Sequence, residues 1–73
     1  MKELSPRQQQ VYDFIEKYQN ANGFSPSQAD IAEGLGLSVP TIHTYIGAIK
    51  RKGGVTNQPG VPRSLRAVRK ALL

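Results

Sequence analysis

The stretch SQADIAEGLGLSVPTIHTYIGAIKRK, residues 27–52, decides the fold. A serine opens each half of it, and a serine oxygen accepts a hydrogen bond from the first turn of a helix. Gly36 separates the halves, because glycine readily takes the left-handed conformation that ends a helix. The apolar residues of the second half recur at helical spacing and are Ile42, Tyr45, Ile46 and Ile49. We therefore predict a short helix after Ser27 and a second over about residues 39–52, joined as a helix-turn-helix.

The flanking segments add one helix before this pair and a β-hairpin after it. Ser5-Pro6 precedes an apolar stripe of helical period, which predicts a helix over about residues 6–21. Two short extended segments, Val55–Asn57 and Leu65–Val68, enclose a loop rich in proline and glycine. The expected fold class is mainly α with a small β-hairpin, a three-helix winged helix-turn-helix domain.

Length and composition restrict what the chain can be. At 73 residues and 8.0 kDa it has room for one small core, so we assign residues 1–68 to the domain and 69–73 to a tail or the start of a linker. There is no cysteine and a single histidine, so we expect no metal centre and no cofactor. The absence of a long apolar run predicts no secretion signal and no membrane span, hence a cytoplasmic protein.

Charge is divided unevenly along the chain. Residues 1–37 hold three basic and five acidic residues, a net charge of −2, whereas residues 38–73 hold seven basic residues and no acidic one. A cationic half of this kind is typical of a surface that faces a polyanion, although a merely basic tail is the plain alternative.

The acidic residues do not indicate an enzyme. Two carboxylate pairs stand at helical spacing, Asp13 with Glu16 and Asp30 with Glu33, and we expect both on solvent faces, with Lys17 as the helix partner of Asp13. Exposed acids lack the raised pKa that acid–base catalysis needs. We therefore predict no catalytic residues.

The helix predicted over residues 39–52 turns small and polar side chains away from its apolar stripe. Such a surface suits close entry into the major groove of DNA, which is roughly 12 Å wide. Expected base-reading residues are Pro40, Thr41, His43 and Thr44. Local capping by Thr41 and simple exposure of His43 are the alternatives, but their common face favours DNA.

Other residues are expected at the DNA backbone. We predict contacts with phosphates, or a place in the wing, for Ser27, Gln28, Ser38, Tyr45, Lys50, Arg51, Lys52, Arg63 and Arg66. Arg63, near the hairpin tip, is expected to reach a phosphate or the minor groove. Core packing by Tyr45, a helix-dipole role for the cations at 50–52 and a solvated strand edge for the two arginines stay open.

The chain resembles the N-terminal DNA-binding domain of the LexA repressors of the bacterial SOS response over about residues 3–68. The resemblance rests on Leu4-Ser5-Pro6-Arg7-Gln8, Gly23-Phe24-Ser25-Pro26-Ser27, Leu35-Gly36-Leu37, Thr41-Ile42-His43, Arg51-Lys52-Gly53 and Pro59-Gly60-Val61-Pro62-Arg63. The block at 41–43 and the one at 59–63 are most similar to the Gram-positive branch.

The resemblance implies a bacterial or phage repressor that occupies operator DNA as a dimer. It places base reading on Thr41 and His43, with Thr44 beside them, and gives Arg63 a place in the wing near the DNA. The chain departs from the family at Pro40, which replaces a small polar residue, at Gly53-Gly54 and in a shorter turn before Thr41. LexA repressors also carry a second, self-cleaving domain that these 73 residues cannot supply, so the sequence is either the DNA-binding part of a longer repressor or a stand-alone relative.

Two other functions compete with duplex DNA binding. A winged-helix module that binds an acidic protein would need apolar anchors on the exposed face of the 39–52 helix, which carries small and polar side chains instead. Single-stranded or RNA binding would need exposed aromatic rings. Core positions are expected for Phe14, Tyr18, Phe24 and Tyr45, which leaves Tyr12 as the one exposed ring. Both alternatives are therefore less favoured.

Overall fold

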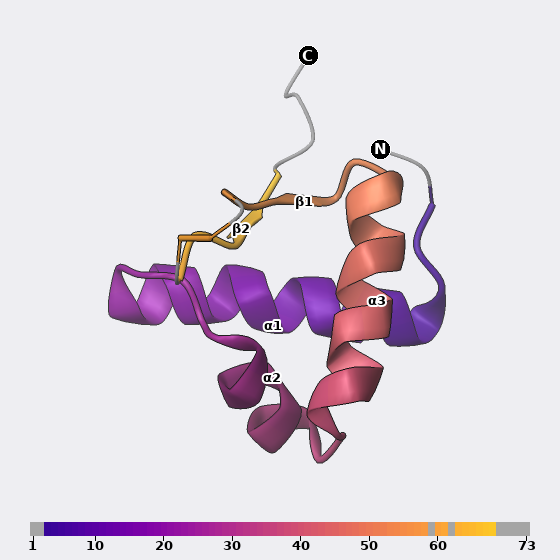
Figure 1. Cartoon of the computed structure of the whole chain (residues 1–73), viewed down its shortest axis with the longest axis horizontal. Coiled ribbons are helices and arrows are strands. Elements are labelled where there is room, and N and C mark those ends of the chain that lie inside the picture. The colour runs from indigo at the N-terminus through magenta and orange to yellow at the C-terminus, as the bar shows by residue number, and fades with distance from the viewer. Residues whose placement is uncertain (1–2, 59, 62, 69–73) are drawn as a thin grey trace.

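Three helices followed by a two-stranded antiparallel sheet make up the computed structural model of the chain (Figure 1). The structure describes residues 3–58, 60–61 and 63–68. The helices are α1 (Pro6–Asn22), α2 (Gln28–Leu35) and α3 (Val39–Arg51), and the strands are β1 (Val55–Thr56) and β2 (Arg66–Ala67). The predicted fold class, a three-helix winged helix-turn-helix, is confirmed. The prolines of the expected hairpin loop, at 59 and 62, and the expected tail at 69–73 lie outside the described residues.

A serine starts each helix, as the sequence predicts. The Ser5 hydroxyl accepts from the Gln8 backbone and the Gln8 side chain accepts from the Ser5 backbone, which completes a capping box. Ser27 makes the same pair of bonds with Asp30 at the start of α2. The turn between α2 and α3 passes through Gly36, whose φ of +68° suits glycine. The helix starts and the turn between α2 and α3 are therefore specified by residues close to them in the sequence.

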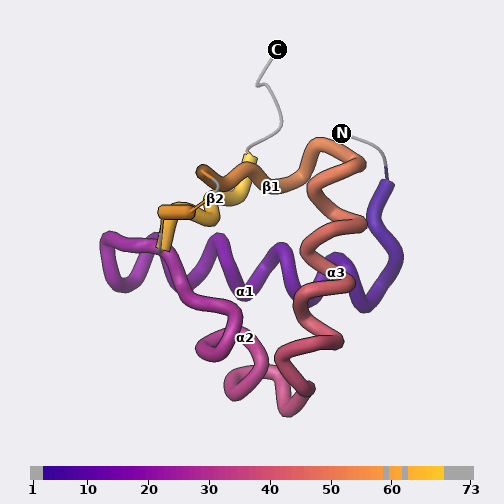
Figure 2. The backbone as a smooth tube through the Cα atoms, in the orientation of Figure 1, coloured from indigo at the N-terminus to yellow at the C-terminus, as the bar shows by residue number. Residues whose placement is uncertain are grey.

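The core lies where the three helices meet. In Figure 2, α1 runs across the molecule behind α3, with α2 below and the sheet above. Each helix places its apolar stripe inward, and the buried hydrophobic residues of the core are Val11, Tyr12, Ile15, Ile31, Ala32, Ile42, Ile46, Ile49, Val55 and Leu65. The stripe predicted for α3 is thus buried, with Tyr45 half-buried at its edge.

The sheet is shorter than the predicted hairpin and is fastened to α1. Val55 pairs with Ala67 and Thr56 with Arg66, so each strand has two residues. The Gln19 side chain accepts a hydrogen bond from the Ala67 backbone, and the Tyr12 hydroxyl donates to the Val68 carbonyl oxygen at 3.0 Å. These bonds fix the base of the wing on the first helix.

The burial of two aromatic residues, Tyr12 and Phe24, is the reverse of what the sequence predicts. Tyr12 is buried, with 7% of its surface exposed, because the C-terminal strand covers a second side of α1. Phe24 is 50% exposed, because it lies beyond the end of α1 and meets Tyr18 edge to face. The expectation of an exposed Tyr12 and a core Phe24 is therefore wrong.

Two expectations about acidic residues are also corrected. Asp30 is not on a solvent face: its side chain is 30% exposed and forms an ion pair with Arg63. Asp13 is exposed as expected, but its carboxylate accepts from the Gln9 side chain at 2.9 Å, and within the described part of the chain no ion pair joins it to Lys17.

Candidate nucleic-acid interface

The first turns of α3 present a polar surface. Pro40, His43 and Thr44 are exposed and Thr41 is half-buried. The Thr44 hydroxyl donates to the Pro40 carbonyl oxygen at 3.1 Å, and the Thr41 and Ser38 hydroxyls lie 2.8 Å apart. The local capping foreseen for Thr41 therefore occurs, since its backbone N–H also donates to Ser38. His43 has no hydrogen-bond partner among the described residues, so its imidazole is free for a ligand.

The far end of α3 carries three cations that point in different directions. At 100° per residue, Lys50 lies on the same edge of the helix as His43, whereas Lys52 lies on the opposite edge. The Lys50 ammonium donates to the Asn57 side chain at 2.7 Å, which shows that the first edge faces the wing. The Lys52 ammonium donates to the Gln8 side chain at 2.7 Å and is committed to the start of α1.

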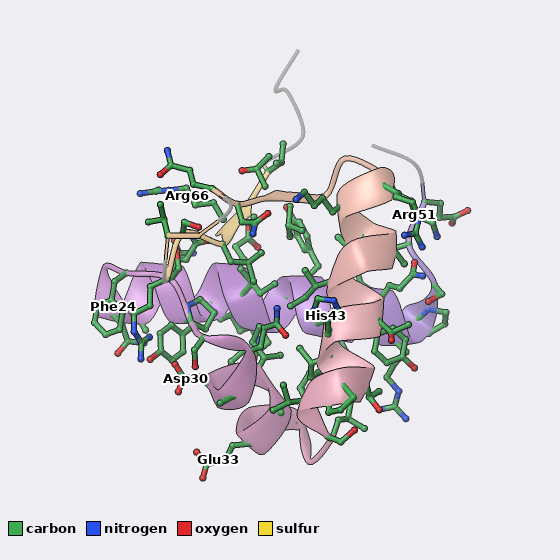
Figure 3. The ribbon with its side chains drawn as sticks, in the orientation of Figure 1. Phe24, Asp30, Glu33, His43, Arg51 and Arg66 are labelled. Carbon is green, nitrogen blue, oxygen red and sulfur yellow. The ribbon has the colours of Figure 1, made fainter. Side chains whose placement is uncertain are left out.

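Arg51 lies between these two edges. Its side chain is exposed and projects from α3 away from the sheet (Figure 3). Together with His43, Thr44 and Gly47 it makes up the outer face of α3, on the side of the helix opposite the apolar stripe. We call His43, Thr44, Gly47 and Arg51 the α3 outer face.

A shallow groove connects α2, α3 and the wing. It is lined by Pro26, Ser27, Gln28, Ile46, Asn57, Val61, Arg63, Ser64 and Leu65. Ser27 and Gln28 lie at the start of α2, where the helix dipole favours an anion, although the Ser27 hydroxyl already accepts from the Asp30 backbone. The structure thus brings three predicted backbone-contacting residues, Ser27, Gln28 and Arg63, to one groove beside α3, whereas Arg66 does not line it.

The two wing arginines differ in their surroundings. Arg66 is exposed on β2, opposite Thr56. Arg63 has a 45% exposed side chain, and its guanidinium donates to the Asp30 carboxylate and to the Ser25 carbonyl oxygen, each at 3.0 Å. Its contact with a phosphate stays a prediction, and in the structure the guanidinium is held against α2.

One residue of this surface was missed from the sequence. Asn57 is exposed, binds Lys50 and lines the groove. Its position at the end of a predicted extended segment was the only available signal. Tyr45, for which core packing was the alternative to a phosphate contact, packs against the core.

No other chemistry stands out on the described surface. Within residues 3–58, 60–61 and 63–68 no cluster of histidine, cysteine or carboxylate side chains could hold a metal ion. In the same part of the chain, none of the helices combines the length and the apolar character that a membrane span requires.

A helix-turn-helix that continues into a two-stranded wing, with a polar outer face on its second helix, defines the winged helix-turn-helix class of DNA-binding domains. Residues 1–64 match the family described as LexA DNA binding domain. The chain belongs to that family.

Relatives among the LexA repressors match nearly the whole chain. It is 40% identical over 70 residues to the LexA repressor of Thermosipho melanesiensis, which covers 96% of this chain and 35% of the relative. It is 36% identical over 73 residues to the LexA repressor of Staphylococcus epidermidis, with 99% and 35% covered. For the LexA repressor of a Geobacillus species the identity is 39% over 66 residues, with 89% and 32% covered. The chain therefore spans about a third of the length of these repressors.

Proposed function

We propose that this domain binds a specific sequence of double-stranded DNA and represses transcription by occupying an operator of the SOS type. The start of α3 enters the major groove and the wing lies along the adjacent backbone. The observation that carries the proposal is the outer face of α3, where short side chains lie beside the exposed imidazole of His43. A face of this kind admits base edges at close range.

Roles follow from the place of each side chain. His43 donates to a purine N7 or O6, and Pro40, Thr41 and Thr44 contact neighbouring base edges. The cations nearest the wing edge and the outer face, Lys50 and Arg51, contact phosphates. The predicted backbone contacts are completed by Ser27, Gln28, Ser38, Tyr45 and Arg66. Lys52 and Arg63, which were also predicted at the backbone, are instead held within the domain, by Gln8 and by Asp30.

Repression requires two such domains on one operator. A winged helix-turn-helix reads one half-site, and two-fold related half-sites are read by two copies. A single domain binds weakly, because joining two copies raises affinity through effective concentration. We propose that the domain acts as a dimer in the bacterial cytoplasm, at the chromosome, and that it contributes DNA binding and no catalysis.

The competing protein-interaction function has little support. A surface that binds another protein uses clustered apolar anchors. The large exposed apolar side chains among the described residues are Phe24, Val39 and Val61, which belong to three different segments, and Phe24 lies beneath the Arg63 guanidinium. None of them is on the α3 outer face.

Selection of bound duplexes from a random pool tests the proposal. We expect a preferred sequence with two related half-sites, and tighter binding to it than to a scrambled duplex of the same composition. If each domain neutralises roughly five phosphates, log K falls against log salt with a slope of about −4 to −5 per domain. Equal affinities for the selected and scrambled duplexes would rule out specific recognition.

A further inference from the structure

The wing is attached to α2 through one arginine. Arg63 has a φ of +53°, a left-handed conformation that residues other than glycine rarely take, and this turns its side chain back toward the body of the domain. Its guanidinium donates to the Asp30 carboxylate and to the Ser25 carbonyl oxygen, each at 3.0 Å. It also lies over the ring of Phe24, with 5.2 Å between the guanidinium carbon and the ring centroid. Three segments separated in sequence thus meet at one side chain.

Asp30 is the fixed partner in this contact. Its carboxylate accepts from the Ser27 backbone at 3.0 Å, in the capping box of α2, and from the Tyr18 hydroxyl at 3.3 Å. The Ser27 hydrogen bonds first, and the Arg63 guanidinium next, hold the pKa of Asp30 below its ordinary value. The carboxylate is therefore ionised at neutral pH and stays in place for Arg63. Figure 3 shows it on the same side of the domain as Phe24.

We propose that Asp30 and Arg63 are positioning residues, and that their ion pair sets the wing at the start of α2 in the orientation that contacts DNA. This inference rests on the proposed function. Arg63 stays on Asp30 when DNA binds, and the wing reaches the duplex through neighbouring side chains, Arg66 among them. The ion pair thus orders the wing before DNA binds, so that less conformational entropy is lost on binding than with a loose wing.

If Asp30 acted only through its negative charge, removing that charge would change DNA affinity in the opposite direction. An acidic side chain close to a groove that faces phosphates repels DNA, so removing its charge should tighten binding to every duplex. A positioning role predicts weaker binding to the preferred duplex. The sign of the change therefore separates the two roles.

The experiment compares Asp30→Asn with Glu33→Gln. The amide in Asp30→Asn keeps an oxygen for the Ser27 backbone, so the start of α2 is preserved. Glu33 is exposed on the same helix and lies apart from Phe24 and Asp30 (Figure 3), so Glu33→Gln removes the same charge without touching the wing. Dissociation constants are measured by fluorescence anisotropy for the selected and scrambled duplexes, and melting curves confirm that each variant is folded.

We expect Asp30→Asn to weaken binding to the selected duplex by about two- to tenfold, the range set by ordering a short loop on binding. Amide hydrogen exchange in the wing, at Gly60 and Val61, should become faster. Glu33→Gln should leave the exchange unchanged and should not weaken binding. Equal or tighter binding of Asp30→Asn to the selected duplex, together with unchanged exchange, would overturn the inference.

The variant Arg63→Ala distinguishes a positioning role from a direct phosphate contact. If Arg63 acts through Asp30, the double variant binds no more weakly than either single variant, and the salt slope is unchanged. If Arg63 contacts a phosphate, the slope becomes shallower by about 0.9 and the two losses add, which overturns the inference. Failure of the wild-type domain to prefer any duplex would instead contradict the proposed function, so the two failures are distinct.

Discussion

Replacing Gly34 by alanine should destabilise the domain, although glycine inside a helix is normally unfavourable. A Cβ at Gly34 would overlap the ring of Phe14 on α1, with Cε2 and Cζ as the nearest atoms. The ring cannot turn aside freely, because it stacks on Tyr18 at 6.1 Å between centroids with an interplanar angle of 26°. Overpacking of this kind costs about 1–3 kcal/mol, and the gain in helix propensity returns about 0.5–1 kcal/mol. We expect a net loss of up to about 2.5 kcal/mol.

Gly47→Ala is the matched control, since Gly47 also lies inside a helix. A Cβ there would meet only the Arg51 guanidinium, at 3.7 Å, which is an ordinary contact. This variant should be more stable than wild type by about 0.5–1 kcal/mol. Urea unfolding followed by circular dichroism measures both changes. Equal stabilisation by the two substitutions would show that the ring of Phe14 moves easily and would refute the reasoning.

Three further predictions concern the interface, the core and the response to pH. His43→Ala should weaken binding to the selected duplex by about 1–3 kcal/mol and leave binding to the scrambled duplex unchanged. Arg51→Ala should weaken binding to both duplexes alike and make the salt slope shallower by about 0.9. Titrations in which the two variants exchange these effects would reverse the assigned roles. Ile46→Ala removes a buried side chain and should lower the free energy of unfolding by about 2–5 kcal/mol in urea titrations, so a loss below about 1 kcal/mol would contradict its place in the core. Because the folded domain holds the pKa of Asp30 below its ordinary value, this group stabilises the fold at neutral pH and loses that contribution as the pH falls through the carboxyl range. The urea midpoint of wild type should accordingly fall more steeply on acidification than that of Asp30→Asn.

The helices could be predicted because their signals are local. Each N-terminal serine satisfies backbone donors within three residues, and the apolar spacing of α3 fixes its buried side without reference to the rest of the chain. The strands were predicted too long. The length of the paired region depends on where the two extended segments diverge, and the composition of neither segment reveals that point.

The outer face of α3 was predictable for the same reason, as it is the complement of the apolar stripe. The surroundings of Arg63 were not. Its partners Asp30 and Ser25 lie 33 and 38 residues away, and no spacing rule relates them. The misplacement of Tyr12 has the same origin, since its partner carbonyl lies 56 residues away.

The central claim is that the α3 outer face, with the wing beside it, is the surface that binds DNA. A map of amide chemical-shift changes on titrating the labelled domain with the selected duplex tests it most directly. The largest changes should fall within residues 38–51 and at Asn57 and Gln58, with small changes along the middle of α1. Shifts concentrated on the exposed side of α1, with α3 unaffected, would contradict the account.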